Sequence, residues 1–276
     1  MRVGLLQTTA SDAPEENAAA LGAMVDRAAG QGAEFVLTPE VSNCVSADRA
    51  RQRAVLRPES EDATLAAMRE AAARHGIWVL LGSIAVLTDD PDGRFANRSI
   101  LIDPQGGIVA RYDKIHMFDV TVSEAETYRE SAGFRPGSRA VMATTPWGGL
   151  GMTICYDIRF PRLYRDLAQA GAAFLSVPAA FSPVTGAAHW ETLLRARAIE
   201  TGCFVLAPAQ TGHHAARAGK PRATWGHSLV VAPWGEVLLD AGTEPGVHVL
   251  DLDPEDVARA RARIPSVTAD REWSGP

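Results

Sequence analysis

One cysteine stands where its thiol could be activated as a nucleophile. Residues 150–154, just before Cys155, form a short apolar run that predicts a β-strand. From Pro161 onward, apolar side chains recur every three to four residues until Gly171, which predicts a helix. We therefore expect Cys155 at a strand-to-helix turn, where the helix N-terminus favours a thiolate and can stabilise an oxyanion. Because a free cysteine is more often a small buried apolar residue, this hypothesis requires catalytic partners elsewhere in the chain.

Two charged residues occupy positions from which they could act on Cys155. A cysteine hydrolase needs a base, an oxyanion stabiliser and a means of releasing its acyl-enzyme. Glu40 follows the apolar run at 34–38, which places a carboxylate at the carboxyl end of a buried strand, where α/β sheets build their sites. Lys114 follows a strand that begins at Gly107. Either residue alone could be an ordinary exposed loop charge, so the hypothesis depends on all three occurring together.

The chain alternates the patterns of strands and helices over most of its length. Three turns, at 103–106, 145–148 and 232–235, have proline at the second position and glycine at the fourth, as type I turns prefer. Hairpins interleaved with βα units predict an α/β fold with large mixed sheets and helices outside. We expect one domain over residues 1–265 and a polar tail at 266–276 that has little to pack on. The strands are expected at 2–8, 34–38, 77–85, 150–154, 174–177, 203–209, 228–232, 236–239 and 247–252, and the helices at 14–31, 65–76, 161–170, 188–202 and 254–263.

The composition limits the classes of partner and the compartment. The chain has 276 residues, 46% of them hydrophobic, so it can bury a large core. A net charge of −6 with scattered Lys and Arg argues against nucleic acid or an anionic membrane as the main partner. No apolar run approaches the length needed to span a bilayer, and the first residues lack a signal-peptide pattern. The three cysteines, an odd number at wide spacing, fit a reducing cytoplasm better than a disulfide framework.

The remaining motifs do not predict a metal ion or a cofactor. His213 and His214 are adjacent, and there is no His-Glu-x-x-His or paired-cysteine motif, so a solvated loop is expected there. Val230 replaces the second glycine of the Gly-x-Ser-x-Gly elbow that a serine hydrolase needs. The glycines at 148–151 enter a strand with no helix after them, unlike a dinucleotide-binding loop. We therefore expect catalysis by protein side chains alone.

Taken together, Glu40, Lys114 and Cys155 resemble the Glu–Lys–Cys triad of the nitrilase superfamily, the carbon–nitrogen hydrolases. The sequence Cys155-Tyr-Asp and the loop Tyr128-Arg-Glu-Ser resemble its small-amidase branch, which contains omega-amidase and deaminated glutathione amidase. True nitrilases typically carry Trp-Glu after the cysteine, whereas this chain carries Tyr156-Asp157. The resemblance covers almost the whole chain. Its further motifs are Val3-Gly-Leu-Leu-Gln7, Leu37-Thr-Pro-Glu40, Tyr112-Asp-Lys-Ile-His116, Gly151-x-x-Ile-Cys155, His189-Trp-Glu, Arg195-Ala-Arg-Ala-Ile-Glu200, Gly226-His-Ser228 and Pro233-Trp-Gly235.

The resemblance implies a four-layer αββα sandwich that pairs as a homodimer. It also implies a role for each residue of the triad. Glu40 is the base, Cys155 is the nucleophile, and Lys114 stabilises the oxyanion together with the backbone N–H of Tyr156. Because Glu40 is expected to be buried beside Cys155, we expect its pKa to be raised.

The resemblance further implies a fourth polar catalytic residue after the lysine loop. Glu130 matches it and would orient Lys114 or the substrate amide, although Glu124 and Glu126 are nearby competitors. Phe181 and Thr185 lie where the family places part of the acyl pocket.

Three arginines could bind a substrate carboxylate through their planar guanidinium groups. Arg195 and Arg197 have carboxylates nearby in the sequence, and we favour structural ion pairs with Glu191 and Glu200 for them. Arg159, close to the nucleophile, is the remaining candidate for binding a substrate carboxylate.

These expectations define an enzyme class. We expect a cysteine-dependent amidase that hydrolyses the terminal amide of a small carboxylic acid, of the ω-amide or deaminated-glutathione type, to the acid and ammonia. The loop at 210–222 carries an extra Gly-Lys-Pro compared with the deaminated-glutathione amidases, which leaves the substrate open. The alternatives are an N-carbamoyl-amino-acid or aliphatic amide hydrolase of the same superfamily and, from another class, a catalytically silent binding protein.

Overall fold

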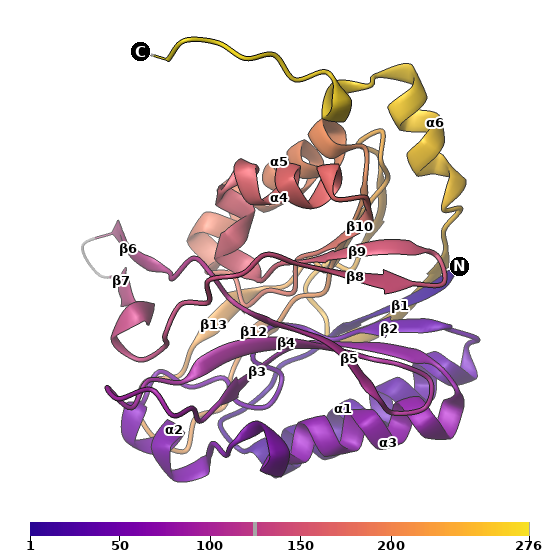
Figure 1. The fold of residues 1–276 in the computed structure, drawn as a ribbon. Coiled ribbons are helices and arrows are strands. Elements are labelled where there is room, and N and C mark those ends of the chain that lie inside the picture. Colours follow the sequence, from indigo (N-terminus) through magenta and orange to yellow (C-terminus); the bar gives the residue numbers. More distant parts are fainter. Residues whose placement is uncertain (124–125, 276) are drawn as a thin grey trace.

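The chain folds into four layers in the order helices, sheet, sheet, helices. The computed structural model describes residues 1–123 and 126–275. Helices α1 (Pro14–Gly30) and α3 (Ala63–His75) cover the outer face of the first sheet, and α4 (Pro161–Gln169) and α5 (Pro183–Thr201) cover that of the second (Figure 1). This arrangement confirms the predicted αββα sandwich.

The two sheets have the same design, with three parallel strands flanked by antiparallel ones. The first sheet has the order β16 (Gly246–Asp251), β1 (Arg2–Gln7), β2 (Phe35–Leu37), β3 (Trp78–Val86), β4 (Ala96–Ile102), β5 (Ile108–Asp113). The second has the order β15 (Val237–Asp240), β14 (Leu229–Val231), β11 (Phe204–Ala207), β10 (Ala172–Ser176), β9 (Gly148–Met152), β8 (Val141–Thr145).

Smaller elements complete the chain. They are α2 (Arg49–Val55), α6 (Glu255–Arg263), the hairpin of β6 (Asp119–Ser123) with β7 (Glu126–Arg129), the hairpin of β12 (Thr211–His213) with β13 (Ala223–Trp225), and the 3₁₀ helices η1 (Glu59–Glu61), η2 (Glu130–Ala132), η3 (Cys155–Arg159) and η4 (Ser266–Thr268). None of the described helices combines the length and apolar character required to cross a bilayer.

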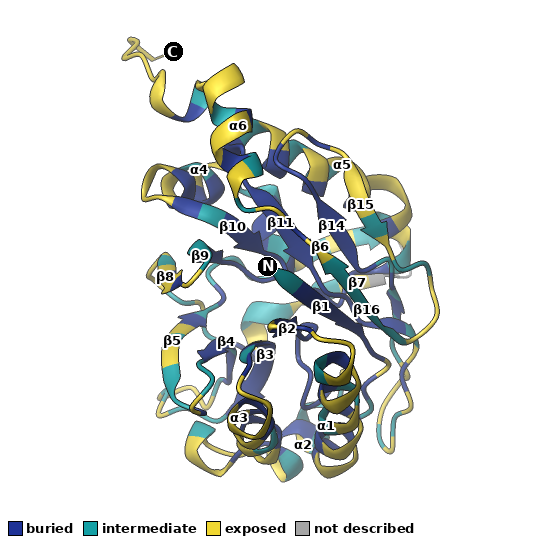
Figure 2. Cartoon of the chain, turned by 90° about the vertical axis from the view of Figure 1, so that its right-hand side faces the viewer, coloured by how far each residue is buried: buried dark blue, intermediate teal, exposed yellow. Residues whose placement is uncertain are grey.

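The inner faces of the two sheets share one apolar core. Leu5 and Phe35 from the first sheet belong to the same buried cluster as Leu150 and Phe174 from the second. A separate cluster lies between the first sheet and its helices, where α1 contributes residues such as Val25 on its buried face. Figure 2 shows this division, with buried strands between helices whose outward faces are exposed. Burial of apolar surface on both faces explains why the central strands have continuous apolar sequences.

The three Pro/Gly turns form hairpins as expected, joining β4 to β5, β8 to β9 and β14 to β15. Two of them close with a backbone hydrogen bond of 2.9 Å, from Gly106 N to Asp103 O and from Gly235 N to Ala232 O. The strand before Cys155 lies two residues earlier than the predicted range 150–154, since β9 spans Gly148–Met152.

Two helices differ from the prediction. Helix α2 was not predicted because three arginines and a glutamine interrupt its short apolar pattern, and Gln52 is its one buried residue. Its start is fixed by Asp48, which accepts a hydrogen bond of 2.7 Å from Arg51 N. Helix α5 begins at Pro183 rather than near residue 188. Proline is favoured in the first turn of a helix because its missing N–H would have no partner there.

The beginning of the tail packs more closely than expected. Val267 is buried in the same apolar cluster as side chains of α4 and α5, and its carbonyl oxygen accepts a hydrogen bond of 3.1 Å from Gln169 in α4. Arg165 in the same helix donates to Ser266 O at 3.0 Å. Only the later residues match the expectation, as Trp273 is 82% exposed.

An irregularity in β3 supports the loop that carries Glu40. The pairing of β3 with β4 shifts between Leu81 and Ile84, and Gly82 N donates to Thr38 Oγ1 at 3.0 Å. Ser83 accepts a hydrogen bond of 2.8 Å from Val41 N through its hydroxyl group. The close approach requires a glycine, because a Cβ at position 82 would lie 1.8 Å from Thr38 O.

We expect Gly82→Ala to lower the free energy of unfolding by about 3 kcal/mol or more, since backbone atoms would have to move. The control is Gly22→Ala in α1, where a Cβ meets nothing within 4 Å. That change should leave the protein as stable or add up to about 1 kcal/mol through helix propensity. Urea unfolding of both variants measures the difference, and equal midpoints would contradict the close-contact explanation.

Candidate active site

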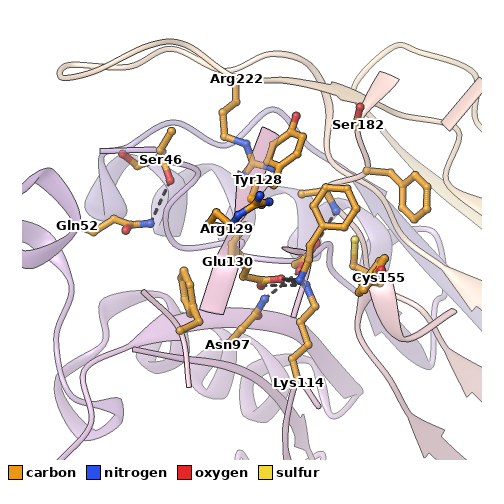
Figure 3. Close-up of a pocket in the computed structure, with 18 of the residues that line it drawn as sticks. Ser46, Gln52, Asn97, Lys114, Tyr128, Arg129, Glu130, Cys155, Ser182 and Arg222 are labelled. Atoms are coloured by element: carbon orange, nitrogen blue, oxygen red, sulfur yellow. Dashed lines mark hydrogen bonds and ion pairs between the residues drawn. The ribbon is translucent and has the colours of Figure 1, made fainter. Parts of the chain in front are cut away.

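The predicted catalytic residues meet in one cavity of about 320 Å³. Figure 3 shows the side chains of Asn97, Lys114 and Glu130 converging beside Cys155. The cavity is lined by Glu40, Val41, Cys44, Ser46, Ala47, Arg49, Gln52, Asn97, Lys114, Phe118, Thr127, Tyr128, Arg129, Glu130, Phe134, Cys155, Tyr156, Ala180, Phe181, Ser182, Thr185 and Arg222.

Glu40 lies at the centre of the hydrogen bonds in the cavity and is only 5% exposed. Its Oε1 accepts from Lys114 Nζ and from Asn97 Nδ2, both at 2.9 Å. Its Oε2 accepts from the backbone N–H of Ala180 at 2.8 Å. Cys155 lines the same cavity, and its thiol is close enough to this carboxylate for each group to shift the pKa of the other. The carboxylate is therefore next to the proton it would have to remove.

Lys114 follows β5 and is 2% exposed between two carboxylates. Glu130, the first residue of η2, accepts from Lys114 Nζ through both of its oxygens at 2.9 Å. Phe118 N donates to Glu130 Oε2 at 2.6 Å and fixes the carboxylate. Of the two competing positions, Glu124 lies outside the described residues, and the side chain of Glu126 is also not described.

The charges in this cluster determine its protonation state. Burial would lower the pKa of Lys114, but Glu130 and Glu40 outweigh it and hold that pKa well above its usual range. Burial would raise the pKa of Glu40, yet the Lys114 charge and its hydrogen bonds lower it overall. The expectation of a raised Glu40 pKa was therefore wrong, because the opposite charge is in direct contact.

The Cys155 side chain is a thiol at rest. Burial raises the pKa of Cys155 well above its usual range, and the neighbouring Glu40 carboxylate raises it further. The expectation of a thiolate favoured by a helix N-terminus was wrong, because burial and the adjacent carboxylate both favour the protonated form.

The backbone at Cys155 adopts an unusual conformation. Its φ angle is +49°, in the left-handed region that non-glycine residues rarely occupy. Its N–H donates to Pro178 O at 2.9 Å, and η3 begins at this residue. A sharp turn that exposes a nucleophile in this way resembles the elbow of α/β hydrolases, with sulfur in place of oxygen.

A buried aspartate connects the cysteine turn with the lysine loop. Asp157 Oδ2 accepts from Ile154 N at 2.8 Å and from Tyr112 Oη at 2.7 Å. Its Oδ1 lies 3.1 Å from His116 N and 2.7 Å from His116 Nδ1. Tyr112 and His116 flank Lys114 in the sequence, so Asp157 links the turn that carries Cys155 to the loop that carries Lys114.

Three of the four predicted substrate-binding residues line the cavity. They are Tyr156, Phe181 and Thr185. Arg159 does not line it, because its guanidinium lies over the Phe181 ring at 5.7 Å and 3.2 Å from His189 Nδ1.

The two other arginines form the structural ion pairs that we favoured. Arg195 lies 3.3 Å from Glu191, and Arg197 lies 2.7 Å from Glu200. Neither guanidinium lines the cavity.

Sequence reasoning missed several residues that line the cavity. Asn97 lies inside β4, where nothing in the apolar pattern distinguishes it from a strand residue. Arg49 and Arg129 belong to elements that were not predicted. Arg222 ends the loop at 210–222, whose position beside the substrate was the one available signal.

The histidine pair is not the solvated loop that we expected. His213 is exposed, but His214 is buried, with Nδ1 2.7 Å from Ala10 O and Nε2 2.7 Å from Thr224 Oγ1. Burial lowers the pKa of His214 to about 4. In the part of the chain that the structure describes, no three His, Cys, Asp or Glu side chains are grouped to hold a metal ion.

Comparisons with known proteins agree with this geometry. The carbon–nitrogen hydrolase family model matches residues 2–262. A deaminated glutathione amidase from Yersinia enterocolitica is 42% identical over 237 residues, which cover 86% of this chain and 81% of that protein.

Solved structures share the fold. The C. elegans NitFhit protein superposes with a TM-score of 0.88 and 35% identity, covering 98% of this chain and 65% of that one. A variant amidase from Nesterenkonia sp. AN1 superposes with a TM-score of 0.77 and 27% identity, covering 96% of this chain and 98% of that one. In that structure acrylamide has undergone Michael addition at the active-site cysteine. The chain described here therefore belongs to the carbon–nitrogen hydrolase family, and it is an amidase of the nitrilase superfamily similar to the deaminated glutathione amidases.

Proposed function

We propose that this amidase hydrolyses an amide of a small carboxylic acid, of the ω-amide or deaminated-glutathione type, through a thioester on Cys155. The observation that carries the proposal is that the buried Glu40–Lys114 ion pair, 2.9 Å between Oε1 and Nζ, lines the same cavity as Cys155. In this proposal the three residues have the roles of nucleophile, base and oxyanion stabiliser.

The first half of the reaction forms the thioester. Glu40 accepts the thiol proton while the sulfur of Cys155 bonds to the amide carbon, and the carbonyl oxygen becomes an oxyanion. Lys114 Nζ and the backbone N–H of Tyr156 stabilise that oxyanion, each contributing about 3 kcal/mol. Tyr156 is the second residue of η3, and the first N–H groups of a helix have no acceptor within it.

The second half releases both products. Glu40 returns its proton to the leaving nitrogen as the C–N bond breaks, so ammonia or an amine departs and the acyl group remains on Cys155. Glu40 then accepts a proton from water, whose oxygen bonds to the thioester carbon. The C–S bond breaks, Glu40 returns the proton to the sulfur to restore the thiol, and the acid leaves. Glu130 keeps Lys114 in place throughout through its two hydrogen bonds.

Guanidinium groups around the cavity support a substrate that carries a carboxylate. Arg49, Arg129 and Arg222 all line it. The hydrogen bonds described for the guanidinium groups of Arg49 and Arg129 go to neutral acceptors, such as the one from Arg49 to Gln52 Oε1 at 2.8 Å. Among the described residues, none of the three arginines forms an ion pair with a carboxylate. In a chain with a net charge of −6, such unpaired cations beside a site favour an anionic ligand.

We further propose that the enzyme is a cytoplasmic homodimer. All three cysteines are free, as suits a reducing compartment. Ile199, Trp234 and Leu238 are large apolar side chains that remain exposed, and Trp234 and Leu238 line the same groove beside α6. An exposed apolar groove favours a partner surface. Light scattering at micromolar concentration should give about twice the chain mass of 29.4 kDa, whereas a single-chain mass would contradict the dimer.

Cys155→Ala should abolish amide turnover, by at least about 10⁴-fold in kcat, because it removes the sulfur on which the proposed thioester forms. The matched control is Cys203→Ala, which removes a buried thiol that does not line the cavity and should keep its activity. Ammonia or amine release measures both variants. Inactivation by an alkylating reagent that mass spectrometry maps to Cys44 would contradict the assignment.

A matched substrate series tests the chemistry and the carboxylate together. We expect the ω-amide of a short dicarboxylic acid to be hydrolysed, its nitrile to react at most in traces, and an amide without the carboxylate to have a lower kcat/KM. Arg222→Gln should lower kcat/KM for the anionic amide alone by about 10-fold or more. Arg159→Gln is the comparison, because Arg159 lies outside the cavity.

Each outcome of this series is decisive for one part of the proposal. A nitrile faster than its amide contradicts amide specificity, and indifference to the carboxylate contradicts the anionic substrate. An N-carbamoyl amino acid as the best substrate would identify the alternative hydrolase. No product from any compound would favour the silent binding protein.

A further inference from the structure

The two oxygens of Glu40 are not equivalent in their hydrogen bonding. Oε1 accepts from two side-chain donors, Lys114 Nζ and Asn97 Nδ2, each at 2.9 Å. Oε2 accepts one backbone donor, Ala180 N at 2.8 Å. Since each carboxylate oxygen accepts about two hydrogen bonds, Oε1 is fully used and Oε2 retains room for one proton.

Asn97 is held rigidly in the position from which it makes this contact. It lies in β4, pairs across the sheet with Ala85, and is 1% exposed. Its backbone carbonyl accepts from Lys114 N at 2.9 Å, so it also fixes the start of the lysine loop.

The orientation of the Asn97 amide is set by Glu40. Its Oδ1 is buried and has no hydrogen-bond partner among the described residues. The reversed orientation would satisfy neither group, because it would place Oδ1 against a carboxylate oxygen. A buried acceptor without a partner lowers the stability of the fold. The hydrogen bond from Asn97 Nδ2 to Glu40 offsets that loss.

We propose that Asn97 is a positioning residue that occupies Oε1 of Glu40 and thereby directs the thiol proton to Oε2. The inference rests on the proposed role of Glu40 as the base. When the S–H bond breaks, the proton forms an O–H bond at Oε2 while sulfur bonds to the amide carbon. The same proton then moves from Oε2 to the leaving nitrogen as the C–N bond breaks.

Removing the Asn97 donor should have two separable effects. The titratable groups around Glu40 are Lys114 after β5, the Cys155 thiol in η3 and, beyond Lys114, Glu130 in η2, and they all remain in place. Without a donor to its charged form, the pKa of Glu40 should rise. If Glu40 became a stronger base and kept its orientation toward the thiol, Cys155 would react faster on the alkaline plateau. If Glu40 loses that orientation, Cys155 reacts more slowly there.

Alkylation of Cys155 by iodoacetamide tests the proposal without a substrate. The variants are Asn97→Leu, which keeps the side-chain size, and Asn97→Ser, a smaller change should the first not fold. The matched control is Ser99→Ala, because Ser99 is buried on the same face of β4 and does not line the cavity. Rates are measured against pH, with the alkylated cysteine identified by mass spectrometry and the melting temperature recorded.

We expect Cys155 to be alkylated about 10- to 100-fold more slowly on the plateau in both Asn97 variants, because the Glu40 carboxylate is displaced by a fraction of an ångström. The acidic limb should move up by about one pH unit. The Ser99→Ala control should match the parent in both. A plateau that is unchanged or higher in the Asn97 variants would overturn the positioning role, as would alkylation of the parent at Cys44. If the rates fall as expected but no amide is hydrolysed, the positioning role stands and the substrate proposal fails.

Discussion

The structure depends on a buried cluster of charged side chains, formed by Glu40, Lys114 and Glu130. Glu40 and Lys114 are almost inaccessible to solvent, and Glu130 is largely so. A charge that leaves water is destabilising by several kcal/mol unless an opposite charge and hydrogen bonds replace its solvation. Each member of the cluster supplies part of that replacement for the others, so the removal of any one leaves an uncompensated charge. The loops that carry them therefore have little freedom to move independently.

The double-sheet architecture is the means by which these groups are brought together. Glu40 and Lys114 come from the ends of strands in the first sheet, whereas Cys155 and Ala180 follow strands of the second. Parallel strands place their carboxyl ends at one edge, and two such edges meet here. Glu40 and Lys114 thus belong to one layer and Cys155 to the other, which explains why the site lies between the sheets and is shielded from water.

The sequence predicted most of the layers because their strands and helices carry strong apolar periodicity. It predicted Glu40, Lys114 and Cys155 because charged or nucleophilic residues at strand ends are informative in combination. Asn97 could not be predicted as a site residue, because nothing in the sequence indicates that a polar residue inside a buried strand contacts Glu40. The protonation states were also inaccessible, because the pKa of Glu40 reflects a balance between burial and the distance to Lys114. Neither quantity can be read from spacing along the chain.

Asp157 gives the molecule a property that extends beyond its active site. Its carboxylate contacts Tyr112 from the first sheet and Ile154 from the turn after the second, so it spans the boundary between the layers. The separation of nucleophile and lysine is consequently tied to the thickness of the core beneath them. A substitution deep between the sheets, at a residue such as Phe35 or Phe174, would be transmitted to the reaction centre as a change of layer spacing. The packing of the hydrophobic core is therefore coupled to the geometry of the active site, and a change in the volume of a core side chain should alter the distance between Cys155 and Lys114 as well as the stability.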